Sequence, residues 1–200
     1  MNPAMRRYYD VRAEEYDEWW QDAGRFTERD RPGWHEDVAA LCAAVAELPP
    51  ARTLDLACGT GFLTAHLRGA VTGLDQSPKM LAVARRRLPE AELVAGDALA
   101  PPFRPGRFDR VFSGHFYGHL DAAQRAEFVR VARTLADELV IVDSASRPDR
   151  ADEEWEERVL NDGSRHEVYK RRFTAAALAA ELGGGETLHA GPWFVAVRSG

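Results

Sequence analysis

The sequence is poor in cysteine and has no long apolar run. Its two cysteines, Cys42 and Cys58, do not form the paired spacing of a zinc site. We read Cys42 as a helix core residue and Cys58 as a small turn residue, and we expect no metal. No apolar run is long enough to span a bilayer, and the first residues lack the hydrophobic core of a secretory signal. We therefore expect a cytoplasmic protein with no membrane partner.

Positive charge is also in short supply. The 200 residues hold 26 Lys and Arg against 32 Asp and Glu, a formal net charge of −6, and the lysines are Lys79 and Lys170 alone. This balance argues against general nucleic-acid binding. The length suits one domain, and we find no repeat or linker. We expect a single domain over 1–200, with a lid helix and loop at 1–32 and the core at 33–200.

The most informative stretch is a strand followed by a glycine turn. Thr53 to Ala57 is a short apolar run with one acid, typical of a buried strand. The turn Cys58 to Gly61 contains two glycines, and Phe62 to Arg68 reads as a helix that stops at Gly69. Glycines let a ligand approach the backbone, and a helix N-terminus offers free N–H groups. This order is typical of a nucleotide-binding unit.

Strands and helices alternate along the rest of the chain. The first helix, 4–20, is rich in aromatics; it either packs over the core or covers a ligand, and the sequence leaves both open. The other elements that we expect are helices at 34–48, 79–88, 122–135, 152–160 and 175–182, and strands at 70–75, 91–95, 108–113, 138–143, 186–190 and 193–198, with an extended stretch at 166–173.

This pattern predicts an α/β fold. We expect a doubly wound, mostly parallel seven-stranded sheet with an antiparallel C-terminal hairpin and an N-terminal helical lid. In such sheets the ligand lies at the carboxyl ends of the strands. The glycine turn, Asp75, Asp97 and the segment 113–119 all fall at those ends.

The motif departs from two familiar nucleotide sites. A dinucleotide fingerprint has a third glycine where this chain has Thr64, and Asp55 inside the strand is not part of it. A P-loop needs a Lys-Ser/Thr pair after the glycines, and the sequence has none there.

The chain resembles the class I S-adenosylmethionine (SAM)-dependent methyltransferases. The resemblance is carried by 55–61 (DLACGTG), 73–81 (GLDQSPKML), 96–98 (GDA) and 108–113 (FDRVFS), which occur in order, and by the opening 9–17 (YDVRAEEYD). Ala57 stands where the family more often has glycine. The resemblance spans nearly the whole chain and implies SAM as methyl donor and S-adenosylhomocysteine as product.

The resemblance also implies residue roles. Asp55 would help to hold the ammonium of SAM, Asp75 would accept the ribose hydroxyls, and Asp97 would accept from the adenine amino group. The cofactor-binding residues expected in full are Tyr9, Tyr16, Asp55, Ala57, Gly59, Gly61, Asp75, Gln76, Met80, Gly96, Asp97, Ala98, Ser113 and Gly114.

Catalytic candidates follow the fourth strand. His115 and His119 lie beside the expected methyl group, and a histidine can act as a base near neutral pH. His119 also has a structural reading, because His-Leu before the next helix recurs in this family. The i, i+4 spacing allows a metal reading, but no acid accompanies it as in H-E-x-x-H, and Gly118 interrupts the segment.

We expect the acceptor to be a small molecule that reacts through oxygen or nitrogen. The N-P-P-Y/F motif of nucleic-acid and protein amino-methyltransferases is missing after the fourth strand, where Ser113-Gly114-His115-Phe116 stands. An RNA or protein target, and a SAM-binding protein without methylation, stay open as alternatives. The basic run 165–172 either binds an anionic acceptor or is a solvated face. Candidate acceptor residues are Trp20, Tyr117, Tyr169 and Arg171. A monomer or a homodimer is expected.

Overall fold

A seven-stranded sheet forms the centre of the computed structural model, which describes residues 3–27 and 29–200. The strand order is β3-β2-β1-β4-β5-β9-β8. Neighbours from β3 to β5 pair in parallel, and β9 runs antiparallel to both β5 and β8. The strands are β1 (Thr53–Leu56), β2 (Val71–Asp75), β3 (Glu92–Ala95), β4 (Arg110–Gly114), β5 (Glu138–Ser144), β8 (Glu186–Ala190) and β9 (Phe194–Ser199). The predicted sheet and its C-terminal hairpin are confirmed.

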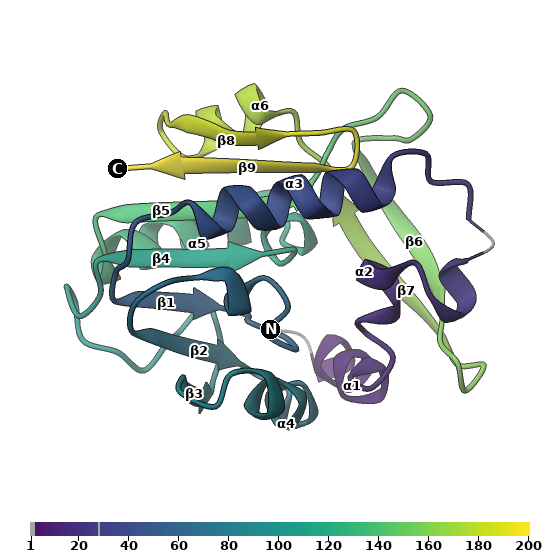
Figure 1. The fold of residues 1–200 in the computed structure, drawn as a ribbon, viewed down its shortest axis with the longest axis horizontal. Helices are drawn as coiled ribbons and strands as arrows, with labels where there is room; N and C mark the ends of the chain where they lie inside the picture. The colour runs from purple at the N-terminus through teal and green to yellow at the C-terminus, as the bar shows by residue number, and fades with distance from the viewer. Residues whose placement is uncertain (1–2, 28) are drawn as a thin grey trace.

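Helices cover both faces of this sheet. In Figure 1, α3 crosses in front of the sheet and α5 lies behind it. The inner strands β1, β4 and β5 are buried on both sides, which explains their apolar composition. The helices are α1 (Pro3–Arg12), α2 (Glu18–Gln21), α3 (Trp34–Ala46), α4 (Pro78–Arg87), α5 (Ala122–Leu135) and α6 (Ala175–Glu181), with short 3₁₀ turns η1 (Gly24–Phe26), η2 (Thr64–His66) and η3 (Tyr117–His119).

A second, two-stranded sheet replaces the helix expected at 152–160. Strand β6 (Glu153–Val159) pairs antiparallel with β7 (Arg165–Arg171), which confirms the extended stretch but makes the helix prediction wrong. Glutamate and arginine favour helix as single residues. In the fold, burial alternates along β6, and Trp155 pairs with Tyr169 across the ladder. Tertiary pairing therefore outweighs helix propensity here.

Two other helices are shorter than the sequence indicates. The segment 4–20 breaks after Arg12 into a turn and the short α2, so the lid is a bent pair of helices. The segment 62–68 forms only the 3₁₀ turn η2. Gly61 lets this turn pack closely against the end of α4, because a Cβ at this position would lie 2.6 Å from Cδ1 of Leu88.

The carboxyl ends of the parallel strands all lie on one side of the molecule. Figure 1 shows α1, α2, β6 and β7 gathered beyond these ends. Tyr8 of α1 packs with Val168 of β7 and with Leu160, which follows β6. Trp20 of α2 and Trp34 of α3 belong to the core cluster that includes Leu41 of α3. Within residues 3–27 and 29–200, no helix is both long and apolar enough to cross a bilayer.

Candidate active site

Two small adjoining pockets lie at the point where the strand order reverses between β1 and β4. We call the first the central pocket; its empty volume is about 440 Å³. The central pocket is lined by Tyr9, Tyr16, Ala57, Gly59, Leu74, Asp75, Gln76, Met80, Gly96, Ala98, Gly114, His115 and Phe116. The adjoining pocket, with an empty volume of about 310 Å³, shares Tyr16, Ala57, Gly59 and Gly114 with it and adds Trp20 and Asp55. This is the place where open α/β sheets bind ligands.

The glycine turn after β1 forms one wall of both pockets. Gly59 has φ +56° and Ala57 has φ +64°, so both adopt the left-handed conformation that favours glycine. A Cβ placed on Gly59 meets no atom within 4 Å. The space beside Gly59 is therefore open to a ligand, whereas Gly61 is closed off by its packing against Leu88.

Asp75 at the end of β2 ties this wall to the next strand. Its Oδ2 accepts from Gly59 N at 2.9 Å, and its Oδ1 accepts from Ser77 N at 2.8 Å. Burial raises the pKa of Asp75 to about 6, although the hydrogen bonds from Ser77 and Gly59 oppose the rise. The carboxyl group lines the central pocket. Its position is set by backbone bonds before any ligand arrives.

Asp55, inside β1, is a buried carboxyl group with one oxygen to spare. Thr64 Oγ1 donates to its Oδ2 at 2.6 Å, while Oδ1 is buried and has no hydrogen-bond partner among the described residues. Burial raises the pKa of Asp55 to about 7, and the charge of Asp75 adds to the rise. An orphaned buried oxygen facing a pocket suits a cationic or hydrogen-bonding ligand group.

The ends of β3 and β4 complete the rim. Gly96 and Ala98 line the central pocket, and Asp97 accepts from Leu99 N at 2.9 Å through Oδ1. Ser113 is fully buried, and its hydroxyl donates to Leu56 O at 2.7 Å, so it joins β4 to β1. Gly114 lines both pockets.

The N-terminal segment covers the central pocket. Tyr9 and Tyr16 line it, with ring centroids 6.3 Å apart. The lid is fastened to the core: Ser77 Oγ donates to Asp10 at 2.5 Å, and Thr60 Oγ1 donates to Asp17 at 2.6 Å. Asp17 also pairs with the guanidinium of Arg87.

His115 lies where the central pocket meets a cluster of aromatic rings. Its ring centroid is 4.9 Å from that of Trp19 and 5.0 Å from that of Trp20. Its Nδ1 is 4.0 Å from Asp143, and its Nε2 is buried without a partner among the described residues. Burial lowers the pKa of His115 to about 3, so the ring is neutral near pH 7.

The other candidates of the 113–119 segment, Tyr117 and His119, are not among the residues that line the central pocket. His119 is held through Nδ1, 2.7 Å from the backbone oxygen of Tyr169, and burial lowers its pKa to about 3. The hydroxyl of Tyr117 donates to Glu181 at 3.0 Å. These contacts join η3 to β7 and α6.

The remaining acceptor candidates are dispersed. Trp20 lines the adjoining pocket and stacks on Phe62 with ring centroids 4.5 Å apart. Tyr169 donates its hydroxyl to Glu153 at 2.9 Å, and Arg171 pairs with the same carboxylate at 3.1 Å. Both are engaged on the solvent side of the second sheet.

A third, larger pocket is rich in arginine and was missed from the sequence. Its lining comes from α2, the loop before α3, the end of β5 with the loop after it, and the second sheet, where consecutive residues 154–158 of β6 all contribute. Seven cations, five carboxylates and four tryptophans line it: Arg29, Arg31, Arg147, Arg150, Arg158, Lys170, Arg172, Asp30, Asp149, Glu154, Glu156, Glu157, Trp19, Trp34, Trp155 and Trp193. Because side chains alternate along β6, Glu154, Glu156 and Arg158 lie on the same face of the strand. The helix predicted at 152–160 did not indicate this grouping.

Metal ligation finds no support in the described residues. No group of three or more His, Cys, Asp or Glu side chains there is placed to hold an ion. Cys58 is buried beside Gly73, and Cys42 lies in α3, half-buried.

Comparisons with known proteins agree with this geometry. Residues 53–138 match the family model of a methyltransferase domain. The chain is 34% identical over 105 residues to a demethylmenaquinone methyltransferase of Thermotoga maritima, and this match covers 50% of this chain and 44% of that protein. It is 42% identical over 123 residues to the dTDP-3-amino-3,6-dideoxy-alpha-D-glucopyranose N,N-dimethyltransferase of Streptomyces fradiae, which covers 55% of this chain and 46% of that protein. The matched regions thus span less than half of these relatives.

A solved structure matches over a greater length. The complex of DhpI with SAH superposes with a TM-score of 0.74 at 25% identity, covering 98% of this chain and 94% of that one. Its similarity extends from the sheet to the segments that cover the strand ends, since nearly the whole chain is included.

Proposed function

We propose that this chain, which carries a methyltransferase domain with the class I fold, transfers a methyl group from SAM to a small-molecule acceptor. The observation that carries the proposal is the central pocket. There the glycine turn after β1 meets a preset carboxyl group at the end of β2, over an apolar floor formed by Leu74 and Met80. This is the combination that a ribose with an attached base requires.

The residues present fit SAM on three grounds. The open space beside Gly59 admits a ligand against the backbone, and Asp75 presents a carboxyl group beside it. The orphaned Oδ1 of Asp55 suits an ammonium group. We assign Gln76, Met80, Gly96, Asp97 and Ala98 to the adenosine end, and Tyr9, Tyr16, Ala57, Ser113 and Gly114 to the methionyl end. Gly61 we assign to packing that shapes the turn.

The chemistry asks mainly for alignment. When bound, SAM supplies a methyl group on a positively charged sulfur, and transfer leaves the neutral thioether S-adenosylhomocysteine. The chain's part is to hold the acceptor's oxygen or nitrogen in line and to keep water out. A buried histidine with a pKa of about 3 is a weak proton acceptor. We therefore propose that neutral His115 orients the acceptor through its free Nε2, and that His119 supports the loop.

A small acceptor suits the closed shape of the site. The lid residues Tyr9 and Tyr16 close over the central pocket, and Trp19 and Trp20 crowd its edge at His115. A folded protein or an RNA helix would not reach a methyl group at this depth without displacing the lid. The similarity to quinone and sugar methyltransferases supports the same choice.

Two measurements test the proposal in sequence. Calorimetry with SAM and with NAD should give binding of SAM alone; binding of NAD without SAM would refute the cofactor assignment. Incubation with methyl-labelled SAM and a panel of small acceptors, an RNA pool and a protein pool should label small molecules. Label in RNA or protein would overturn the acceptor class, and SAM binding with no labelled acceptor would favour a non-methylating SAM-binding protein.

A further inference from the structure

We propose that the arginine-rich pocket binds a small aromatic oxyanion, a carboxylate or a phosphoryl group on a ring, as the methyl acceptor. The role of this molecule as a methyl acceptor rests on the proposed function, whereas the binding site is inferred from the geometry of the pocket itself. The space between its walls is about 1590 Å³, part of it open to solvent.

Cations outnumber carboxylates in the lining of this pocket. The lining holds seven cations against five carboxylates, in a chain whose net charge is −6. Two of the seven, Arg31 and Lys170, pair with Asp22 and Asp143 outside the lining, so the cations left to attract an anion are chiefly Arg29 and the group of Arg150, Arg158 and Arg172. Field lines from such a concave surface attract anions.

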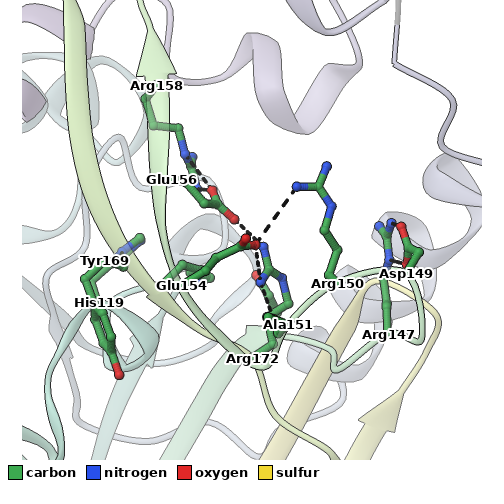
Figure 2. Close-up of polar contacts among 12 residues, drawn as sticks. His119, Arg147, Asp149, Arg150, Ala151, Glu154, Glu156, Arg158, Tyr169 and Arg172 are labelled. Carbon is green, nitrogen blue, oxygen red and sulfur yellow. Dashed lines mark hydrogen bonds and ion pairs between the residues drawn. The ribbon is translucent and has the colours of Figure 1, made fainter.

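Several arginines of this pocket share their counter-ions. Figure 2 shows Glu154 between Arg150 and Arg172, with nitrogen–oxygen distances of 4.0 and 2.8 Å. Glu156 in turn pairs with both Arg158 and Arg172. Three guanidinium groups therefore share two carboxylates, and their remaining N–H donors suit a further anion.

Arg29 adds a cation with no ion pair among the described residues. Partial burial and then the charges of Arg158 and Arg31 lower the pKa of Arg29, which places the three guanidinium groups within mutual repulsion. An oxyanion bound among them would relieve this repulsion. Arginine is the cation suited to this task, because its planar fork matches carboxylate and phosphate oxygens.

The lining of this pocket also has an aromatic part. Four of the chain's five tryptophans, Trp19, Trp34, Trp155 and Trp193, line the pocket. Trp155 is 68% exposed, the most exposed large apolar side chain described. Arg147 covers the ring of Trp193 and Arg31 that of Trp34, each with Cζ 3.8 Å from the ring centroid. A flat ring with a negative group matches such paired surfaces.

The pocket adjoins the place where methyl transfer would occur. Trp19 lines it, and the Trp19 ring lies 4.9 Å from that of His115 in the central pocket. Lys170 lies in its wall, and its Nζ is 2.5 Å from Asp143 Oδ1, which lies 4.0 Å from His115 Nδ1. An anion held by the arginines would therefore direct the other end of the molecule towards His115.

Tryptophan fluorescence gives the test. The protein, with and without saturating S-adenosylhomocysteine, is titrated with benzoate, with phenyl phosphate and with neutral benzamide. We expect one or both anions to bind at least about tenfold more tightly than benzamide, and the advantage to shrink as salt rises. The two anions distinguish a carboxylate from a phosphoryl acceptor. Equal affinity for benzamide and both anions would overturn the proposal.

Variants locate the site. Arg29→Gln removes an exposed cation, so the fold should persist, and anion affinity should fall about tenfold. Arg107→Gln makes the same charge change at an exposed pair with Glu92, remote from the pocket, and should leave affinity unchanged. Equal losses in both would mean a general charge effect and would refute the site.

The proposed function and this inference fail separately. Anion binding in a protein that binds no S-adenosylhomocysteine would sink the methyltransferase proposal and leave the anion site. Transfer of label from SAM to neutral acceptors only, with no anion binding, would do the reverse.

Discussion

Asp75 fixes the glycine turn of its neighbouring strand: its Oδ2 accepts a 2.9 Å hydrogen bond from the backbone N–H of Gly59. One carboxyl group thereby sets the wall of the central pocket and lines it at the same time. Replacing Asp75 should therefore affect the shape of the site as well as its chemistry.

We predict that Asp75→Ala weakens SAM binding at least tenfold, because both the carboxyl oxygens and the preset turn are lost. Asp75→Asn, which keeps one acceptor oxygen, should lose less. Calorimetry gives the dissociation constants. Asp109→Ala is the control, since that exposed carboxylate pairs with Arg52 at the opposite ends of the strands. An unchanged affinity in Asp75→Ala would remove its assigned role.

Gly59→Ala should block the site by filling it. The new Cβ projects into open space at φ +56°, and the left-handed conformation costs about 1 kcal/mol of stability. Gly163→Ala is matched, with φ +83° and open space at the β6–β7 turn. Both variants should lose similar stability in thermal unfolding, but only Gly59→Ala should lose SAM affinity. Similar affinities in the two would show that no ligand approaches Gly59.

The parts of the fold that the sequence predicted are those in which local pattern and tertiary environment agree. The buried strand at 138–143 has an apolar centre, Leu139 to Val142, that predicts it directly. Ser77 followed by Pro78 begins α4 with a cap whose hydroxyl accepts from Met80 N. The motif residues lie close together in the fold, as predicted, because parallel strands bring their carboxyl ends to one edge of the sheet.

The arginine-rich pocket was beyond reach because its residues follow no single motif. Arg29 precedes α3, Arg147 follows β5, Arg158 belongs to β6, and Arg172 follows β7. Residues 152–160 have the composition of an exposed helix, and only pairing with β7 turns that composition into a charged wall. The sequence did point to a basic run at 165–172, but Lys170 is buried against Asp143 and Arg171 faces Glu153.

Binding of SAM should depend on pH through Asp55. In the free protein its pKa is raised to about 7, chiefly by burial, so the carboxyl group is mostly protonated at pH 6. An ammonium group favours the ionised form, so binding should release a proton and affinity should rise with pH from about 5 to 7. Calorimetry in buffers of different ionisation enthalpy counts the proton.

Two variants sharpen the assignment to Asp55. Asp55→Asn should abolish most of this pH dependence. Thr64→Val removes the hydrogen bond that lowers the pKa of Asp55, so the midpoint should move to higher pH. If the wild-type affinity were flat between pH 5 and 8, Asp55 would not contact the ammonium.

The two site histidines should stay neutral across physiological pH. Burial lowers the pKa of His115 and of His119 to about 3, so their ring signals in NMR should not titrate between pH 8 and 5. Since the unfolded chain takes up protons at these residues near pH 6.5, their contribution to stability should decrease as pH falls from 6.5 towards 3. Titration of His115 near pH 6.5 would restore it as a general base.

The lid should open when its fastening to the core is cut. Asp17 accepts from Thr60 at 2.6 Å and pairs with Arg87, whose Nη1 also donates to Thr60 O at 2.8 Å. These half-buried contacts hold Tyr16 over both small pockets. Asp17→Asn keeps the size of the side chain but removes its charge. We expect SAM to dissociate several-fold faster from this variant, because a charge-assisted contact of this kind is worth about 1 to 3 kcal/mol.

Arg86→Gln supplies the matched control for the lid. Arg86 lies one residue before Arg87 and pairs at 3.3 Å with Glu14, which belongs to the lid as Asp17 does. Both side chains of this pair are largely exposed, at 63% and 78%. Exposed pairs contribute little, so this variant should release SAM at the wild-type rate. Stopped-flow displacement by S-adenosylhomocysteine measures both rates. Equal rates in Asp17→Asn and the wild type would mean that the lid is held by its aromatic packing alone, with Tyr9 and Tyr16 as the next residues to replace.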